Sequence, residues 1–191
     1  MGKKYGEALL QEKYGTMKKA AAFYNNQMLD HLNDVMKWFI SQQDMVFIST
    51  ADGRGNCDSS FRGGQLGFVR VINEKTLIYP EYKGNGVMAS MGNIVENPHI
   101  GLMFLDFLEN QIGLHVNGKA SIMENDQLYL LDIPNRMINT IIEEETKAER
   151  WIVIEVEEAY IHCAKYIPKF QKVNSEKQKN GDFFNVRKSY N

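Results

Sequence analysis

The chain has 191 residues, of which 43% are hydrophobic and 24% are charged, and its formal net charge is −2. A nearly balanced charge argues against nucleic acid or an anionic membrane as the main partner. The length suits one domain with a sizeable core. We therefore expect a single domain over 1–191, with an N-terminal helical region over 1–43, a core over 44–165 and a C-terminal tail over 166–191.

The cysteines and the apolar segments of the sequence indicate the cellular compartment to expect. The chain contains two cysteines, Cys57 and Cys163, in no CxxC or His/Cys cluster, so neither a disulfide framework nor a metal site is expected. Charged residues interrupt the N-terminal stretch before a signal-peptide core forms. No apolar run approaches the roughly 20 residues of a membrane span. We expect a reducing, cytoplasmic setting.

The first 43 residues carry helical patterns. Residues 2–15 form a short amphipathic stretch that ends at Gly15. Met28, Leu32, Val35 and Phe39 then recur at helical spacing, which predicts a helix over 28–40 that Asn25 or Asn26 caps. We favour a helix packed across one end of a barrel over a dimer contact or a pocket cover, because an apolar stripe usually belongs to a core.

Strands dominate the rest of the chain. A hairpin connection is expected at 51–56, and Pro80 is expected to mark a strand end or an edge. A buried strand is predicted over 99–106, and an internal glycine predicts a bend in one long strand near Asn117 and Gly118. Strands are expected at 45–49, 59–72, 76–79, 99–106, 112–122 and 151–156.

Two helical insertions interrupt these strands. One helix is predicted from Gly84 to about Glu96. The other begins at Asp126, breaks at Pro134 and continues through residues 137–142, followed by a solvated run at 143–145. Strands that follow one another directly favour a small closed antiparallel barrel with helices outside it. A doubly wound fold is disfavoured, because it needs strands and helices in regular alternation.

Groups that suit a bound phosphate gather between residues 58 and 93. A phosphate needs fixed positive charge, hydroxyls, amides and backbone N–H groups. Ser90 and Asn93 are three residues apart and share a helical face. The arginines could instead be ordinary solvated residues of strands, and the glycines could serve only to form turns. The candidate binding residues are Arg62, Gly63, Arg70, Lys83, Gly84, Asn85, Ser90 and Asn93.

The run over about 45–163 resembles the pyridoxamine 5'-phosphate oxidase-like flavoproteins, the split-barrel FMN-binding superfamily. The sequence motifs that show the resemblance are Phe61-Arg62-Gly63-Gly64, Gly67-Phe68-Val69-Arg70-Val71, Gly84-Asn85, Asn93-Ile94-x-x-Asn97-Pro98, Gly101-Leu102-Met103-Phe104 and Val116-Asn117-Gly118-Lys119-Ala120. The resemblance implies a mainly β fold with peripheral helices, an antiparallel split barrel of Greek-key type.

The resemblance also implies FMN as the cofactor. It assigns the phosphate grip to Arg70 and Ser90, with Arg62 and Asn93 nearby. On that basis Arg70→Ala is expected to weaken FMN by about 1.5–3 kcal/mol and riboflavin little. The chain departs from the oxidase pattern at the helix start, where a paired Arg/Lys is replaced by Gly84-Asn85.

The function implied is an FMN-dependent oxidoreductase acting on a small organic substrate, with NAD(P)H as a possible donor. No catalytic residue stands out, and His115 is expected to be a satisfied barrel histidine. A flavin-binding sensor without turnover is an alternative function, and a deazaflavin or haem is an alternative ligand. Pyridoxamine 5'-phosphate oxidase itself is disfavoured, because the C-terminal Arg-x-His segment of that enzyme does not occur here.

A homodimer with two FMN molecules at its interface is the implied assembly. A small barrel cannot enclose a flavin, so the flavin lies on the outer wall and one ring face needs a second surface. We expect the run 99–106 and the aromatics Phe104, Phe107 and Trp151 to supply that self-complementary surface.

Overall fold

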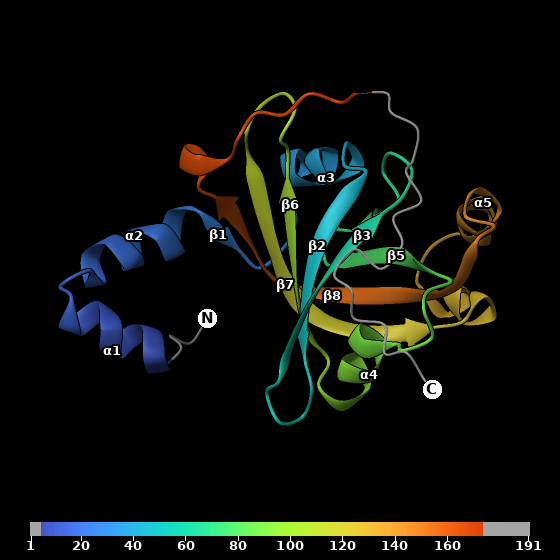
Figure 1. Ribbon diagram of the computed structural model, residues 1–191, viewed down its shortest axis with the longest axis horizontal. Coiled ribbons are helices and arrows are strands. Elements are labelled where there is room, and N and C mark those ends of the chain that lie inside the picture. The colour runs from blue at the N-terminus through green and yellow to red at the C-terminus, as the bar shows by residue number, and fades with distance from the viewer. Residues whose placement is uncertain (1–4, 174–191) are drawn as a thin grey trace, which may run out of the picture.

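The computed structural model describes residues 5–173, which form one antiparallel sheet with helices around it (Figure 1). Phe183 and Phe184 of the expected tail lie outside the described residues. The strands are β1 (Met28–Leu29), β2 (Met45–Ala51), β3 (Cys57–Gly63), β4 (Arg70–Asn73), β5 (Thr76–Tyr82), β6 (His99–Leu105), β7 (Gly113–Met123) and β8 (Ala148–His162). The helices are α1 (Tyr5–Lys13), α2 (Met17–Asn26), α3 (Asp34–Ser41), α4 (Ala89–Glu96) and α5 (Asn135–Glu144), with short 3₁₀ turns η1 (Asn125–Leu130) and η2 (Ala164–Tyr166).

The strand order is β3-β2-β6-β7-β8-β5-β4, and β1 adds to β8. The mainly β, split-barrel fold predicted from the sequence is confirmed. The closed barrel is not confirmed, because β3 and β4 lie at the two ends of this order and do not pair with each other. Within residues 5–173, each of these two edge strands pairs with its hairpin partner alone, β2 for β3 and β5 for β4. The barrel is therefore open along one side.

The bend near Asn117 and Gly118 is confirmed as a β-bulge between β7 and β8. Asn117 faces Glu158 while Gly118 faces Val156, so Glu157 is the extra residue on β8. A Cβ on Gly118 would lie 2.0 Å from the carbonyl oxygen of Glu155. Glycine at this position lets the two strands approach closely where the sheet curves.

Two hydrophobic clusters stabilise the fold. The larger one fills the barrel, with Ile40, Val46, Phe104 and Val116 fully or almost fully buried. The smaller one lies under α5 and contains Ile78, Leu128, Ile138, Ile141, Trp151 and Val153. The indole N–H of Trp151 donates to Asn125 Oδ1 at 2.7 Å, which satisfies the polar atom of an otherwise buried ring.

The helix predicted over 28–40 is wrong in its first half. Met28 and Leu29 pair with β8 as a short strand, and α3 begins only after Asn33. The side chain of Asn33 accepts the N–H of Met36 at 2.9 Å, so Asn33 is the N-cap. Asn26 instead ends α2. Strand pairing with a distant segment overrode the local helical spacing.

Other boundaries also differ from the sequence-based expectation. Helix α4 begins at Ala89 rather than Gly84. Strand β6 alternates between buried and partly exposed residues, so it is not buried on both faces. Glu145 was expected to be solvated, yet it is 6% exposed. Strand β5 continues through Pro80, which faces Trp151 of β8 beyond the end of the β4 pairing, so Pro80 lies at an edge as predicted.

The aromatic surface expected for dimerisation does not form as predicted. Phe104 and Trp151 are both fully buried within the monomer, because β6 and β8 turn these rings into the two clusters. Phe107 stacks on Phe170 with ring centroids 5.0 Å apart. Phe104 and Trp151 are therefore not available to cover a partner. Among the helices within 5–173, none has the length and apolar character needed to cross a membrane.

Candidate functional site

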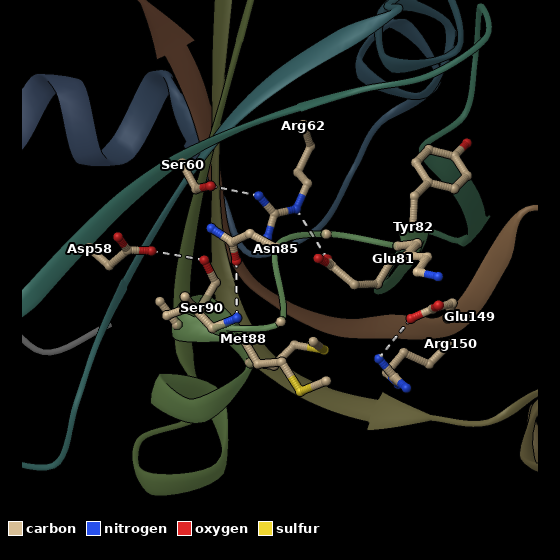
Figure 2. A pocket seen from close by; sticks show the side chains of 16 residues that line it. Asp58, Ser60, Arg62, Glu81, Tyr82, Asn85, Met88, Ser90, Glu149 and Arg150 are labelled. Atoms are coloured by element: carbon tan, nitrogen blue, oxygen red, sulfur yellow. Dashed lines mark hydrogen bonds and ion pairs between the residues drawn. The ribbon is translucent and has the colours of Figure 1, made fainter. Parts of the chain in front are cut away.

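The candidate site lies at the opening of the barrel, between edge strand β3 and strand β5. Arg62 on β3 reaches across this opening, and its Nε donates to Glu81 Oε2 on β5 at 3.1 Å. The Nη1 of the same guanidinium donates to Ser60 Oγ at 2.6 Å. Figure 2 shows these side chains converging from the two strands. The ion pair thus bridges strands that share no backbone hydrogen bonds.

The N-terminus of α4 points into this opening without a side-chain cap. Its N-cap residue, Met88, has a left-handed backbone with φ 55°. The N–H groups of Ala89, Ser90 and Met91 find no acceptor among residues 5–173. Three free N–H groups and the positive end of the helix dipole favour a bound anion.

The loop before α4 is shaped by its own residues. Asn85 Oδ1 accepts the N–H of Val87 at 3.0 Å, and Gly86 has φ +83°. Glycine is favoured there because an L side chain would be strained at positive φ. The loop carries Lys83, which makes no ion pair with any described residue. It therefore adds an unneutralised charge to the lining of the cavity that also contains the start of α4.

These elements enclose a cavity of about 560 Å³. Its acidic residues, Asp58, Glu81 and Glu149, equal its basic residues in number. Asp58 accepts the hydroxyl of the buried Ser90 at 2.8 Å, and Glu149 lies 3.5 Å from Arg150 Nη1. The lining comprises Asp58, Ser60, Arg62, Glu81, Tyr82, Lys83, Gly84, Asn85, Gly86, Val87, Met88, Ala89, Ser90, Met91, Glu149 and Arg150.

A second hollow of about 850 Å³ adjoins the first and shares Arg62, Glu81, Tyr82 and Gly84 with it. The Tyr82 hydroxyl donates to the buried Glu145 at 2.6 Å. Burial and this hydrogen bond raise the pKa of Tyr82, so the phenol stays protonated. Gly63 lines this second hollow rather than the first.

The structure brings five of the eight predicted binding residues to one cavity: Arg62, Lys83, Gly84, Asn85 and Ser90. Arg70 is elsewhere, with its Nη2 2.7 Å from Glu144 Oε2 of α5 and 3.9 Å from Glu145 Oε1. Asn93 points to β2, where its amide donates to Thr50 Oγ1 at 3.0 Å. Asn93 therefore holds α4 against the barrel in this structure.

Sequence reasoning did not single out Asp58, Glu81, Glu149 or Arg150 as members of the site. Asp58 stands in the same polar run as Arg62, which was a usable signal. Glu81 precedes Lys83 by two residues, but nothing local marks it as the partner of Arg62. Glu149 and Arg150 come from β8, and only the pairing of β8 with β5 brings them here.

The imidazole ring of His115 has a hydrogen-bond partner, as expected. Its Nε2 lies 2.8 Å from His162 Nδ1, and its ring stacks on Tyr160. Burial and the neighbouring His162 lower the pKa of His115. Within the described part of the chain, no three His, Cys, Asp or Glu residues gather as a metal site.

Comparisons with known proteins agree with this architecture. A structure of HupZ from Group A Streptococcus matches with a TM-score of 0.51 and 21% identity, over 68% of this chain and 93% of that one. A protein from Lactobacillus delbrueckii assigned as a pyridoxamine 5'-phosphate oxidase matches with a TM-score of 0.51 and 16% identity, over 70% and 98% of the two chains. Both likenesses concern the fold alone. No curated protein matches the sequence.

The sequence model of one family covers most of the barrel. The model described as "Pyridoxamine 5'-phosphate oxidase" matches residues 32–163, which is more than half of the chain and includes every strand except β1. The chain therefore belongs to the pyridoxamine 5'-phosphate oxidase family.

Proposed function

We propose that this protein is an FMN-binding flavoprotein and that the flavin phosphate binds at the N-terminus of α4. The observation that carries the proposal is the uncapped start of α4, where three free N–H groups and the unpaired Lys83 face one cavity. A phosphate dianion satisfies such donors. The cavity volume of about 560 Å³ lies within the range of about 300–1,000 Å³ typical of small-molecule sites.

The acidic residues of the cavity suit the next part of the ligand. A ribityl chain carries hydroxyl groups that donate hydrogen bonds, and the carboxylates of Asp58 and Glu81 accept them. Glu81 is already paired with the Arg62 guanidinium, and Asp58 already accepts the hydroxyl of Ser90. The exposed apolar side chains of Val87 and Met88 offer contact to a flat ring. The residues present therefore fit FMN.

The reaction proposed is an oxidoreduction of a small organic substrate, with NAD(P)H as the candidate electron donor. FMN supplies the redox chemistry when bound. The chain binds and orients it, and the second hollow beside Tyr82 and Glu145 offers a place for the substrate. A flavin-binding sensor or storage role without turnover is the competing function. Both cysteines are free and exposed, which fits the cytoplasmic setting that belongs to this proposal.

The working unit proposed is a homodimer with one FMN at each of two symmetry-related sites. The cavity opens on the outside of the barrel, so a second subunit is needed to cover the exposed ring face. Light scattering of the flavin-loaded protein tests this. A species near the chain mass of 22.0 kDa with flavin still bound would contradict the dimer.

Fluorescence titration with FMN and with riboflavin tests the ligand. Lys83→Gln should weaken FMN by about 1.5–3 kcal/mol, or about 10- to 150-fold, because it removes a charged donor to phosphate. Riboflavin lacks the phosphate and should bind with nearly unchanged affinity. Lys119→Gln is the matched control, since Lys119 is a half-exposed lysine paired with Glu157 outside the cavity.

Equal losses for FMN and riboflavin in Lys83→Gln would contradict a phosphate at α4, and absence of FMN binding to the wild type would refute the proposal. Titration of Arg70→Ala decides the role that the resemblance gave to Arg70, which faces Glu144 here. If the protein binds haem or a deazaflavin more tightly than FMN, that ligand and not FMN is its cofactor. NAD(P)H oxidation by the FMN-loaded protein separates an enzyme from a protein without turnover.

A further inference from the structure

The loop that joins β5 to α4 contains a chemically reactive pair of residues, Asn85 and Gly86. The loop covers residues 83–88, and every residue in it is exposed. Both members of the pair line the cavity proposed for the flavin phosphate, and Figure 2 shows the side chain of Asn85 among those of this cavity. An asparagine that precedes glycine in an exposed loop can lose its side-chain amide nitrogen without an enzyme.

This reaction, deamidation, closes a succinimide ring in the main chain. The backbone nitrogen of Gly86 attacks Cγ of Asn85, so a bond forms between these two atoms and the Cγ–Nδ2 bond breaks. Nδ2 leaves as ammonia and takes up the proton that the Gly86 nitrogen gives to solvent. Water then opens the ring at one of its carbonyl carbons, which leaves an aspartate or an isoaspartyl link at position 85. The only other reactant is water.

The geometry at Asn85 favours ring closure. Its Oδ1 accepts the N–H of Val87 at 3.0 Å, which folds the side chain back over the peptide bond to Gly86 and brings Cγ towards that nitrogen. The same hydrogen bond stabilises the negative charge that develops on Oδ1 during the attack. The Gly86 N–H finds no acceptor among residues 5–173, so no hydrogen bond has to break before it reacts.

Gly86 leaves the attacking nitrogen uncrowded. Its φ is +83°, and a Cβ at this position would meet nothing within 4 Å. Glycine has no side chain to obstruct the approach to Cγ, and its backbone rotates freely. Lys83 in the same loop makes no ion pair with any described residue. Its positive charge favours the anionic form of the amide nitrogen that attacks.

A second Asn-Gly pair, Asn117 and Gly118, is held in the opposite situation. It lies on β7, where both residues pair with β6 on one side and with β8 on the other. The Asn117 amide donates to Glu158 Oε2 at 3.2 Å. Ring closure there requires β7 to detach locally from two strands, which costs free energy. The two pairs have the same composition, so the fold alone distinguishes them. A third pair, Asn180-Gly181, lies outside the described residues.

Deamidation of Asn85 changes the charge of the cavity. Acidic and basic residues of the lining are equal in number before the reaction, so a carboxylate at position 85 gives the acidic residues an excess of one. This carboxylate repels a phosphate and competes with it for the free N–H groups at the start of α4. We propose that Asn85 deamidates spontaneously and that the carboxylate formed lowers the affinity of the cavity for the flavin phosphate. The second part rests on the function proposed above.

Peptide mapping by mass spectrometry tests the first part. Full-length wild-type protein is incubated without flavin, at neutral pH, in water enriched in heavy oxygen, so that each deamidated residue carries the label. We expect the label to enter at position 85 at least about tenfold faster than at position 117, because the paired strand opens rarely. In urea-unfolded chain the two rates should converge. Equal rates in the folded protein, or faster labelling at Asn117, would overturn this part.

Fluorescence titration tests the second part. Asn85→Asp copies the aspartyl product and should bind FMN about tenfold more weakly than Asn85→Ser, which has no charge at this position. Riboflavin has no phosphate and should bind the two variants with nearly equal affinity. Equal FMN affinities, or an equal loss for riboflavin, would overturn the effect on phosphate. A wild type that binds no FMN would refute the FMN proposal and this effect together, whereas the labelling test of the first part uses no flavin.

Discussion

Replacing Gly118 with alanine should destabilise the protein by about 3 kcal/mol or more, at the upper end of what overpacking costs. The new Cβ would lie 2.0 Å from the carbonyl oxygen of Glu155, 3.0 Å from its carbonyl carbon and 3.2 Å from Ile154 Cγ2. The two nearest atoms are backbone atoms, so no change of rotamer relieves the contact. Strands β7 and β8 would have to separate at the bulge and lose hydrogen bonds there.

Urea unfolding followed by circular dichroism measures this change, provided that the transition is two-state. Gly92→Ala is the matched control, because Gly92 lies within α4 and a Cβ there meets nothing within 4 Å. That control should stabilise by about 0.5–1 kcal/mol, since alanine favours a helix interior. A loss below about 0.5 kcal/mol in Gly118→Ala would mean that the bulge relaxes freely, and it would refute the close approach inferred for β7 and β8.

Three further predictions concern stability. Asn33→Ala should cost about 1 kcal/mol in urea unfolding by removing the cap of α3, while Asn33→Asp should change little. Ile138→Ala should cost about 2–5 kcal/mol, because this side chain of α5 is fully buried in the smaller cluster; a loss equal to that of Met137→Ala, at a half-exposed neighbour, would contradict this cluster. The pKa of His115 is lowered from 6.5 in the folded state, so the unfolded chain takes up the proton first and stability falls as pH drops below about 6.5. That fall should be smaller in His115→Gln, and an identical pH profile would contradict it.

Local patterns in the sequence predicted most of the strands, the bend at Gly118 and part of the site. The single strand expected over 59–72 is wrong, because this run forms the two separate edge strands β3 and β4 at opposite ends of the strand order. Alternating apolar residues report which face of a strand is buried, and an internal glycine marks a close approach of backbones. Lys83, Gly84, Asn85 and Ser90 lie within eight residues of one another, so a single loop and the helix it opens bring them together. These features depend on neighbouring residues, which is why they were visible without a structure.

Only the tertiary structure decided which strands meet. The Arg62–Glu81 pair, and the approach of Arg150 to α4, require β3 and β5 to face each other across an opening that no local pattern encodes. Arg70 has the same local appearance as Arg62, yet the packing of α5 places Glu144 beside it. Met28 reads as helical, but a partner on β8 makes it a strand. Contacts between distant segments form only when the whole chain closes, so the partner of each charge is a property of the fold.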